Sequence, residues 1–349
     1  LYGTVSDLTI KYSKIAGGEG TGTIAGLSEG RILNCKVENT VISGKDKIGG
    51  LVGIAMTEST METSTILDTC NVKGENNVGG LIGYSNNNVI IKSSSNGAEI
   101  IGKDYVGGIT GISFYGTTIQ NCFNFSKSIK AENYVGGLVG YSAAQIEKSH
   151  NQTLSESDAT ISGKNYVGGL VGLNYIMGDI TECFNNGKII VLEDNCGGIA
   201  GLNNSNISNC YNKGQIDCSQ ATGLKIGGLV GQNLSDSYIY TSYSIGKINN
   251  NNYAGGVVGA DFGIVSKSFC IENCLELPNG EKDYNKTDKT GNSYGNYVKI
   301  KHTNGYYTLY AHLKYGSVTV KVGDKVSIQG NEGFVTEVIK GHETEWNGE

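Results

Sequence analysis

A six-residue motif built on two adjacent glycines recurs along most of this chain and constrains its fold more than any other feature. The clearest copy reads Ile48-Gly-Gly-Leu-Val-Gly53. Further copies occupy 78–83, 106–111, 135–140, 167–172, 196–201, 226–231 and 254–259, and a weaker first copy lies at 22–26. The closing glycines are 27, 30, 28, 29, 32, 29, 30 and 28 residues apart. Such a regular period predicts a stack of similar units rather than several unrelated domains.

A second half-motif lies between successive copies of the hexapeptide, and its clearest form is Ile207-Ser-Asn-Cys-Tyr-Asn-Lys-Gly214. We assign the position of its cysteine to Cys35, Cys70, Ser94, Cys122, Ser149, Cys183, Cys210 and Ser242. Cys and Ser are both small, so we expect a buried filler in a stacked column. A metal or disulfide role is the alternative, although these positions lack a Cys-x-x-Cys pair and a nearby His. Nine cysteines cannot all pair within one chain, and Cys270 and Cys274 are the closest in sequence.

Each unit contains two short β-prone runs, one in each half-motif, and most units add a third, such as 187–191. Asn- and Gly-rich links separate the runs, and no segment shows a sustained helical period. A single unit cannot bury its own apolar face, whereas stacked units can. The sequence therefore predicts an all-β fold, a repeat β-solenoid of about nine units. Neighbouring coils about 4.8 Å apart would form a rod on the order of 40–45 Å long.

The paired glycines and a set of tyrosines have expected roles in this stack. A Cβ at the glycine pair would clash in every layer, so we expect close backbone approach or a corner there. Tyr105, Tyr134, Tyr166 and Tyr253 each precede a hexapeptide by one residue. We interpret this tyrosine ladder as packing. A strip that binds sugar or peptide is the alternative, because Tyr offers both an aromatic face and a hydroxyl.

Composition and charge narrow the function classes. The net charge of −6 and the pI of about 5.4 argue against nucleic-acid or anionic-membrane partners, which favour a basic face. No apolar run reaches the ~18 residues of a spanning helix. No signal peptide is evident, and because the chain opens at Leu1 we expect a fragment or a processed form. We interpret Asp46, Asp104 and Asp261 as turn residues rather than calcium ligands.

The repeated hexapeptide resembles the GLUG repeat, which is named for its Gly-Leu-hydrophobic-Gly core. The similarity covers roughly residues 20–275. GLUG repeats occur in large secreted or surface-attached bacterial proteins, including adhesin-like chains. The resemblance therefore implies an extracellular or cell-surface location and a modular role.

The repeat fades after about Cys274, and we divide the chain into a solenoid at 1–275, a linker at 276–292 and a C-terminal β-module at 293–349. Strand-like alternation is present at 297–302, 308–313 and 317–322. Asn304-Gly305 and Gly323-Asp324 are turn signals between these runs. We expect a small antiparallel sheet.

Residues 293–333 resemble part of a lysostaphin- or LytM-type zinc endopeptidase, a family that cuts cell-wall peptide bridges. The elements that carry this resemblance are Gly-Asn at 295–296, His-Thr-Asn-Gly at 302–305, Tyr-Ala-His-Leu at 310–313 and Val-Gly-Asp at 322–324. The resemblance implies that His312 matches a histidine that assists catalysis beside a zinc-bound water. No His-x-x-x-Asp motif precedes this segment and no His-x-His follows it, so the family's metal ligands do not carry over. The tail offers only His342, with Glu343 and Glu345 as possible carboxylate substitutes.

These features predict a bacterial surface scaffold or adhesin-like protein whose C-terminal module is an inactive relative of cell-wall peptidases. Its expected partners are peptidoglycan or a host-surface glycan or protein, with no cofactor. The alternative is a zinc endopeptidase whose remaining ligands lie outside this chain. Four histidines in 349 residues do not readily supply the three protein ligands of a catalytic zinc. A phage or conjugative-element protein that meets the cell wall briefly is a third option.

Overall fold

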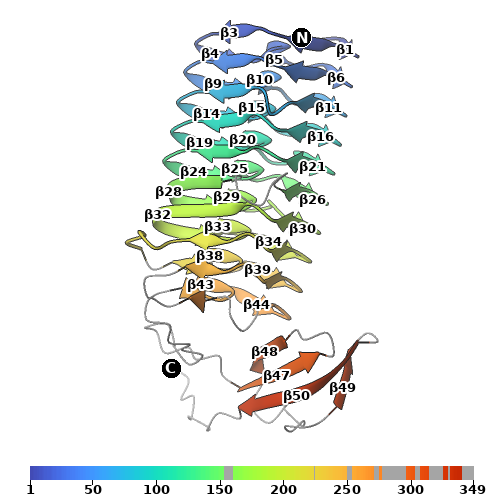
Figure 1. Cartoon of the computed structure of the whole chain (residues 1–349). Coiled ribbons are helices and arrows are strands. Elements are labelled where there is room, and N and C mark those ends of the chain that lie inside the picture. The colour runs from blue at the N-terminus through green and yellow to red at the C-terminus, as the bar shows by residue number, and fades with distance from the viewer. Residues whose placement is uncertain are drawn as a thin grey trace.

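Short strands wind into ten stacked coils that form one rod, with a small sheet after the last coil (Figure 1). The computed structural model describes residues 1–152, 160–223, 225–249 and 254–270, and the backbone of strands at 275–276, 296–302, 307–313, 325–328 and 331–339. Each strand of the rod pairs in parallel with its equivalent in the next coil, as Val52 pairs with Ala25 on one side and Ile82 on the other. The prediction of an all-β solenoid is confirmed.

Four sheets line the rod, and their strands are as follows. Sheet A contains β1 (Thr4–Ser6), β6 (Arg31–Leu33), β11 (Thr60–Glu62), β16 (Ile90–Lys92), β21 (Thr118–Gln120), β26 (Gln145–Glu147), β30 (Ile180–Thr181), β34 (Asn206–Ser208), β39 (Tyr238–Tyr240) and β44 (Ile264–Ser266). Sheet B contains β2 (Thr9–Lys11), β7 (Lys36–Glu38), β12 (Thr65–Ile66), β17 (Ser95–Asn96), β22 (Phe123–Asn124), β27 (His150–Asn151), β31 (Phe184–Asn185), β35 (Tyr211–Asn212), β40 (Tyr243–Ser244) and β45 (Phe269–Cys270).

Sheet C has two columns. The first contains β3 (Lys14–Ala16), β8 (Val41–Ser43), β13 (Asn71–Lys73), β18 (Glu99–Ile101), β23 (Ser128–Lys130), β36 (Ile216–Asp217), β41 (Ile248–Asn249) and β46 (Leu275–Glu276). The second contains β4 (Glu19–Thr21), β9 (Asp46–Gly49), β14 (Asn76–Gly79), β19 (Asp104–Gly107), β24 (Asn133–Gly136), β37 (Ile226–Gly227) and β42 (Ala254–Gly255), while β28 (Thr160–Gly168) and β32 (Lys188–Gly197) run through both columns. Sheet D contains β5 (Ala25–Ser28), β10 (Val52–Ala55), β15 (Ile82–Ser85), β20 (Thr110–Ser113), β25 (Val139–Ser142), β29 (Val171–Asn174), β33 (Ala200–Asn203), β38 (Val230–Asn233) and β43 (Val258–Asp261).

A typical coil therefore has five strands of two to four residues, more than the two or three β-prone runs that the sequence shows in each unit. Single residues with a left-handed backbone conformation separate several of these strands. The corner between sheets A and B is formed in every coil by a non-glycine residue with φ between 45° and 56°: Asp7, Asn34, Thr63, Ser93, Asn121, Lys148, Glu182, Asn209, Thr241 and Lys267. Such a backbone costs an isolated residue about 1 kcal/mol, which the pairing of the flanking strands offsets. Among the described glycines, only Gly20 and Gly116 have positive φ.

The hexapeptide glycines instead allow close backbone approach, as expected. A Cβ on the second glycine would lie about 2 Å from the next coil's equivalent carbonyl, for example 2.1 Å between Gly108 and Gly137 O. A Cβ on the closing glycine would strike the second column of sheet C in the preceding coil, 2.4 Å from Ile48 N in the case of Gly83. Sheet D thus packs almost backbone to backbone against sheet C.

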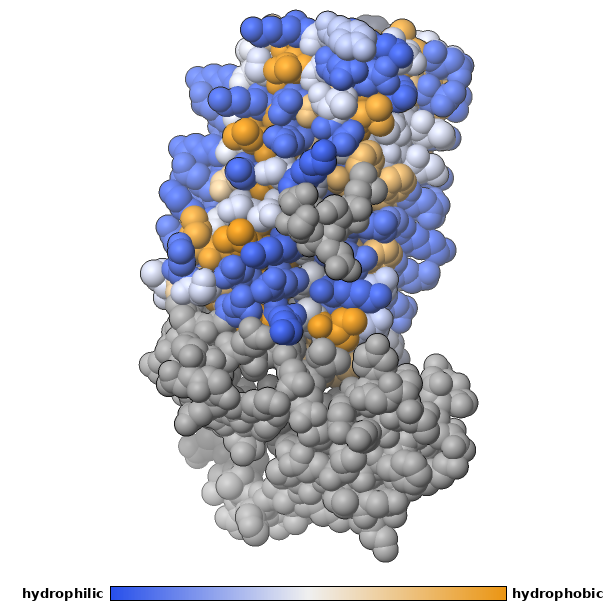
Figure 2. Space-filling view, viewed as in Figure 1, coloured by the Kyte–Doolittle hydropathy of each residue, from blue (hydrophilic) through white to orange (hydrophobic). Residues whose placement is uncertain are grey.

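Columns of aliphatic residues fill the interior. Sheet A, for example, directs Ile32, Met61, Ile91, Ile119, Ile146, Ile180, Ile207 and Ile239 inward, all buried. Burying each such side chain contributes about 1.5–3 kcal/mol. The outer face in Figure 2 is mostly hydrophilic with small apolar patches, so apolar surface is concentrated inside the rod.

The interior also holds two buried asparagine ladders that the sequence analysis did not anticipate. In sheet B each Asn amide donates to the Oδ1 of the next Asn at 2.7–2.8 Å, in the order Asn96, Asn124, Asn151, Asn185 and Asn212. In sheet D, Asn174, Asn203 and Asn233 continue to Asp261 in the same way at 2.8–2.9 Å. A buried amide without a partner is costly, so each ladder stabilises stacking only as a continuous row.

The three aspartates expected in turns lie at strand ends, where each links neighbouring coils. Asp46 and Asp104 begin β9 and β19, and each accepts a hydrogen bond from an Asn amide of the next coil, at 2.6 Å from Asn77 and 2.8 Å from Asn133. Asp261 ends β43 and the second ladder, and its Oδ1 also accepts the Gly263 N–H at 3.1 Å, which closes the turn before β44 as expected. The carboxylates of Asp46 and Asp104 link neighbouring coils instead.

The C-terminal strands β47 (Asn296–His302), β48 (Tyr307–Leu313), β49 (Lys325–Ile328) and β50 (Asn331–Ile339) form an antiparallel sheet in the order β48-β47-β50-β49. The strands predicted at 297–302 and 308–313 are confirmed. The run at 317–322, its neighbouring turns and most of the linker lie outside the described residues. No helix of membrane-spanning length and apolarity occurs in the part of the chain that the structure describes.

Candidate functional site

His312, the residue matched to a catalytic histidine, lies in β48 beside a β-bulge. Tyr310 pairs with Val298 and Leu313 pairs with Asn296, so two residues, Ala311 and His312, face the single residue Tyr297. Bulges are common next to active sites, where they redirect a side chain. His302 ends β47, the strand paired with β48, so both histidines belong to one sheet. His342 lies outside the described residues.

His150 is far from that sheet in sequence and is held in a stack of rings. It lies parallel to Phe123 at 5.4 Å and to Phe184 at 4.5 Å between ring centroids. Burial lowers the pKa of its imidazole. The stack continues through Tyr211, Tyr243 and Phe269 at 4.9–5.4 Å. His150 is therefore a packing residue of sheet B.

The described residues do not supply a zinc site. They contain no group of three or more His, Cys, Asp or Glu side chains close enough to share a metal ion. Because His150 is occupied in the ring stack, only His302, His312 and His342 remain for a zinc in the C-terminal module. This set does not fit the family pattern, which also needs the aspartate of a His-x-x-x-Asp motif upstream of the segment. We therefore derive no reaction step through zinc.

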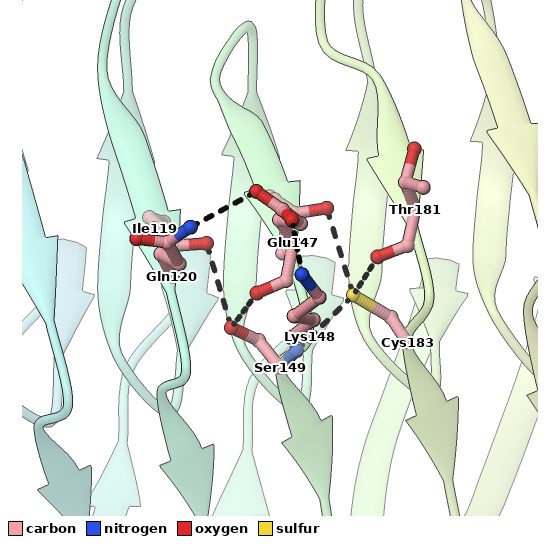
Figure 3. A network of polar contacts seen from close by, with 8 residues as sticks. Ile119, Gln120, Glu147, Lys148, Ser149, Thr181 and Cys183 are labelled. Carbon is pink, nitrogen blue, oxygen red and sulfur yellow. Dashed lines mark hydrogen bonds and ion pairs between the residues drawn. The ribbon is translucent and has the colours of Figure 1, made fainter.

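The small-residue column of the second half-motif is present and buried. Ser149 is representative (Figure 3): its hydroxyl donates to the carbonyl oxygens of Glu147 at 2.8 Å and Ile119 at 3.4 Å, and its backbone N–H donates to the Cys183 sulfur at 3.4 Å. The Cys183 thiol in turn donates to the carbonyl oxygens of Thr181 and Ile146. Cys and Ser are interchangeable here because a thiol or a hydroxyl can bridge neighbouring coils.

Cys70 was assigned to the wrong column. Ser64 occupies the position between Cys35 and Ser94, since its hydroxyl accepts the Cys35 N–H and its own N–H donates to the Ser94 hydroxyl, both at 3.1 Å. Cys70 instead precedes β13 and lies in line with Thr40. The irregular length of this unit, which places Leu67, Asp68 and Thr69 after β12, concealed the shift.

The described cysteines are free and buried, which confirms the filler interpretation. Burial raises the pKa of Cys122 and of Cys218 to about 12. A thiol with so high a pKa is a poor nucleophile at neutral pH. Cys274 lies outside the described residues.

The tyrosine ladder is also packing, because its ring faces cover one another. Tyr105 and Tyr134 stack at 4.7 Å, and Tyr134 and Tyr166 stack at 4.6 Å. Burial raises the pKa of Tyr134 and, to about 12, that of the adjacent Tyr141. A sugar would need an open ring face, so these rings do not form the binding strip. Tyr253 lies outside the described residues.

Comparison with known families supports both resemblances. Residues 284–337 match the model of peptidase family M23. Residues 163–190, which begin within β28, contain β29, β30 and β31 and reach the start of β32, match the GLUG motif. No curated protein and no solved structure matches this chain.

The GLUG match covers about one coil of the ten, yet the same pairing register continues through the neighbouring coils. The chain is thus a β-solenoid with a GLUG-motif match in one coil, followed by a segment that matches the M23 peptidase family. The M23 match includes all four strands of the C-terminal sheet, except the last two residues of β50, and both His302 and His312. It begins at residue 284, within the stretch that the sequence analysis treated as a linker.

Proposed function

We propose that this chain is a bacterial surface scaffold that attaches to peptidoglycan, with the M23 segment as a non-hydrolytic wall-recognition module. The observation that carries this proposal is the M23 match at 284–337 directly after ten coils of solenoid. A β-solenoid of continuous sheets is a rigid spacer, since each coil is hydrogen-bonded to both neighbours. The match to a peptidase family model favours the wall as the partner.

The proposal that the module does not hydrolyse its partner depends on how many residues could coordinate a catalytic zinc. A catalytic zinc needs three protein ligands and one open position. The chain has four histidines, one of which is stacked between Phe123 and Phe184. Neither of the family's spaced ligand motifs is present around the M23 segment. Recognition of a wall peptide needs the sheet and its loops but not the metal.

Metal content, wall clearing and wall binding of the full chain test this function. We expect less than one zinc per ten chains by elemental analysis, no clearing of a suspension of bacterial cell walls, and co-sedimentation with purified sacculi. One tightly bound zinc together with clearing that a chelator abolishes would overturn the non-hydrolytic part. Failure to sediment with sacculi would overturn wall attachment.

A zinc endopeptidase is the second candidate function, and one observation favours it. The M23 match contains His302 and His312, which lie on the paired strands β47 and β48. Under this alternative the chain clears walls, and the variant His312→Ala loses clearing while it still sediments with sacculi. The variant His150→Phe is the matched control, because a phenyl ring preserves the sheet B stack.

A further inference from the structure

Two tyrosines in sheet A depart from the repeat in a way that packing does not require. Tyr238 and Tyr240 both lie on the outer face of β39, with Ile239 buried between them. They pair with Asn206 and Ser208 of the preceding coil, and no other strand of sheet A contains an aromatic residue. The equivalent positions of sheet A hold residues of several kinds without a ring, so stacking of the coils does not require the two tyrosines.

Unlike the ladder tyrosines, these two rings are not packed between other aromatic rings, and only the Tyr240 ring has a neighbour over its face, the Lys267 ammonium group. Tyr238 is 47% exposed and Tyr240 is 42% exposed, and neither stacks on another aromatic ring among the described residues. Residues i and i+2 of a strand lie on the same face about 7 Å apart. Exposed aromatic rings on a flat sheet suit the apolar faces of sugar rings, and the phenol groups add hydrogen-bonding partners.

A cation completes the patch. Lys267 follows β44, and its Nζ donates to the Tyr240 hydroxyl at 3.0 Å and lies 5.1 Å from the centre of that ring. No ion pair within the described part of the chain involves Lys267. The exposed Asn206 and Asn209 flank the two rings, and the Asn206 amide donates to Asp179 Oδ1 at 2.9 Å. The site therefore presents aromatic faces and an ammonium group that no carboxylate of the described residues pairs with.

We infer that Tyr238, Tyr240 and Lys267 form a binding site for a carboxylate-bearing glycan strand. The rings would stack on the sugars, and the ammonium group would pair with their carboxylates, a charge complementarity that neutral or cationic polymers lack. The site lies on the last two coils, close in sequence to the M23 segment at 284–337. The choice of cell-wall glycan as ligand rests on the proposed function.

Substitution by the residues of the preceding coil tests the site with little risk to folding. The variant Tyr238→Asn/Tyr240→Ser makes β39 resemble β34, which the fold already accommodates in the same register. The matched control is Tyr2→Ser/Tyr12→Ser, which removes two other exposed tyrosines, each 81% exposed, from the first coil. Lys267→Gln removes the charge alone. Circular dichroism verifies that all variants retain the wild-type spectrum.

The probe is a soluble glycan strand freed of its stem peptides, titrated into the full chain by calorimetry. We expect the double variant at β39 to bind at least about tenfold more weakly, Lys267→Gln to weaken binding and remove its salt dependence, and the control to bind like the wild type. Equal binding by the wild type and the β39 variant, or no binding by either, would overturn the site. Sedimentation with intact sacculi is measured in parallel and reports separately on the proposed attachment to the wall.

Discussion

At the residue scale, the second glycine of the hexapeptide lies where the two half-motifs of the repeat contact each other. A Cβ on Gly108 would lie 2.1 Å from Gly137 O in the next coil and 2.5 Å from the Asn124 side chain in sheet B. Close contact between coils and room for the asparagine ladder therefore depend on the same missing side chain. This explains why the Gly-Gly pair and the Cys-x-Asn half-motif recur together.

Gly108→Ala is expected to destabilise the solenoid by about 3 kcal/mol, since the Gly137 carbonyl belongs to the backbone and the Asn124 amide is held in the ladder. The control is Gly18→Ala, because no atom lies within 4 Å of a Cβ at that position. Urea unfolding followed by circular dichroism measures both variants. A midpoint for Gly108→Ala equal to that of the control would show that the coils can separate at little cost.

The asparagine ladder predicts that the loss of stability on replacing an asparagine depends on its position in the ladder. Asn151 accepts the Asn124 amide and donates to Asn185, both at 2.7 Å. Asn151→Leu leaves the buried Asn124 amide without this acceptor, whereas Asn185 Oδ1 keeps the Gly187 N–H at 3.0 Å. A buried polar group without a partner costs about 1–3 kcal/mol. Asn212→Ser should cost less, because Ser244 already ends the ladder next to Asn212. Thermal unfolding should rank the two variants in this order, and the reverse order would contradict a continuous ladder.

The buried thiols predict a loss of stability at alkaline pH. The pKa of Cys122 is raised to about 12 in the folded chain, whereas an unfolded cysteine titrates near 8.5. Between these values the unfolded state loses its proton first, so stability falls as pH rises from about 9 towards 12. Cys122→Ser should reduce this slope, because Ser does not titrate and occupies the same column elsewhere. Unfolding midpoints at pH 8 and pH 10.5 test it, and identical slopes for both proteins would refute it.

At the scale of elements, one corner of the coil carries alternating charges. The residues just before the second column of sheet C are Lys45, Glu75, Lys103, Glu132, Lys164 and Glu193. Their backbones are hydrogen-bonded from coil to coil, as in Glu132 N to Lys103 O and Lys164 N to Glu132 O, both at 2.7 Å. Lys164 forms an ion pair with Glu132 at 3.1 Å. Each of the four inner charges thus has an opposite charge in the coil on either side of it.

Glu132→Lys would place three lysines in consecutive coils and is expected to lower the thermal midpoint in low salt. Glu132→Gln is the control that removes the charge without reversing it, and it should have a smaller effect. Because these side chains are exposed, salt screens their interaction. The difference between the two variants should shrink from 20 mM to about 0.5 M NaCl, and a difference that salt leaves unchanged would point to a steric cause.

The sequence predicted the repeat, the solenoid and the role of the glycines because each depends on a residue type that recurs at a fixed spacing. It did not predict five strands per coil, since strands such as Thr65–Ile66 are too short to show alternation. Residues with positive φ, such as Lys148 and Glu182, are not turn formers by type, so that corner was not recognised. Asn212 was visible in the half-motif, but only pairing in register shows that it lies inside. Of the candidate site, the sequence placed His312 in a strand, and the bulge at that position emerged only from the pairing.

At the scale of the whole molecule, the protection of backbone amides from hydrogen exchange is expected to vary along the rod. The inward residues Val5 and Ile10 of the first coil are only half-buried, whereas Ile32 and Val37 at the same positions in the second coil are buried. Local opening of the first coil therefore exposes little additional apolar surface. Hydrogen exchange followed by mass spectrometry should show faster exchange in β1 and β2 than in β21 and β22. Uniform rates along the rod would mean that the coils open together.

Because charges alternate at the corner before sheet C, the gain or loss of an even number of coils differs from that of an odd number. Loss of one coil from the middle would bring two like charges into contact, whereas loss of two would restore the alternation from lysine to glutamate. Each pair of coils changes the length of the rod by about 9–10 Å and leaves the alternation of charges at this corner intact. If the rod holds its last coils and the M23 segment at a set distance from its first coil, that distance can change by recombination most easily in steps of two.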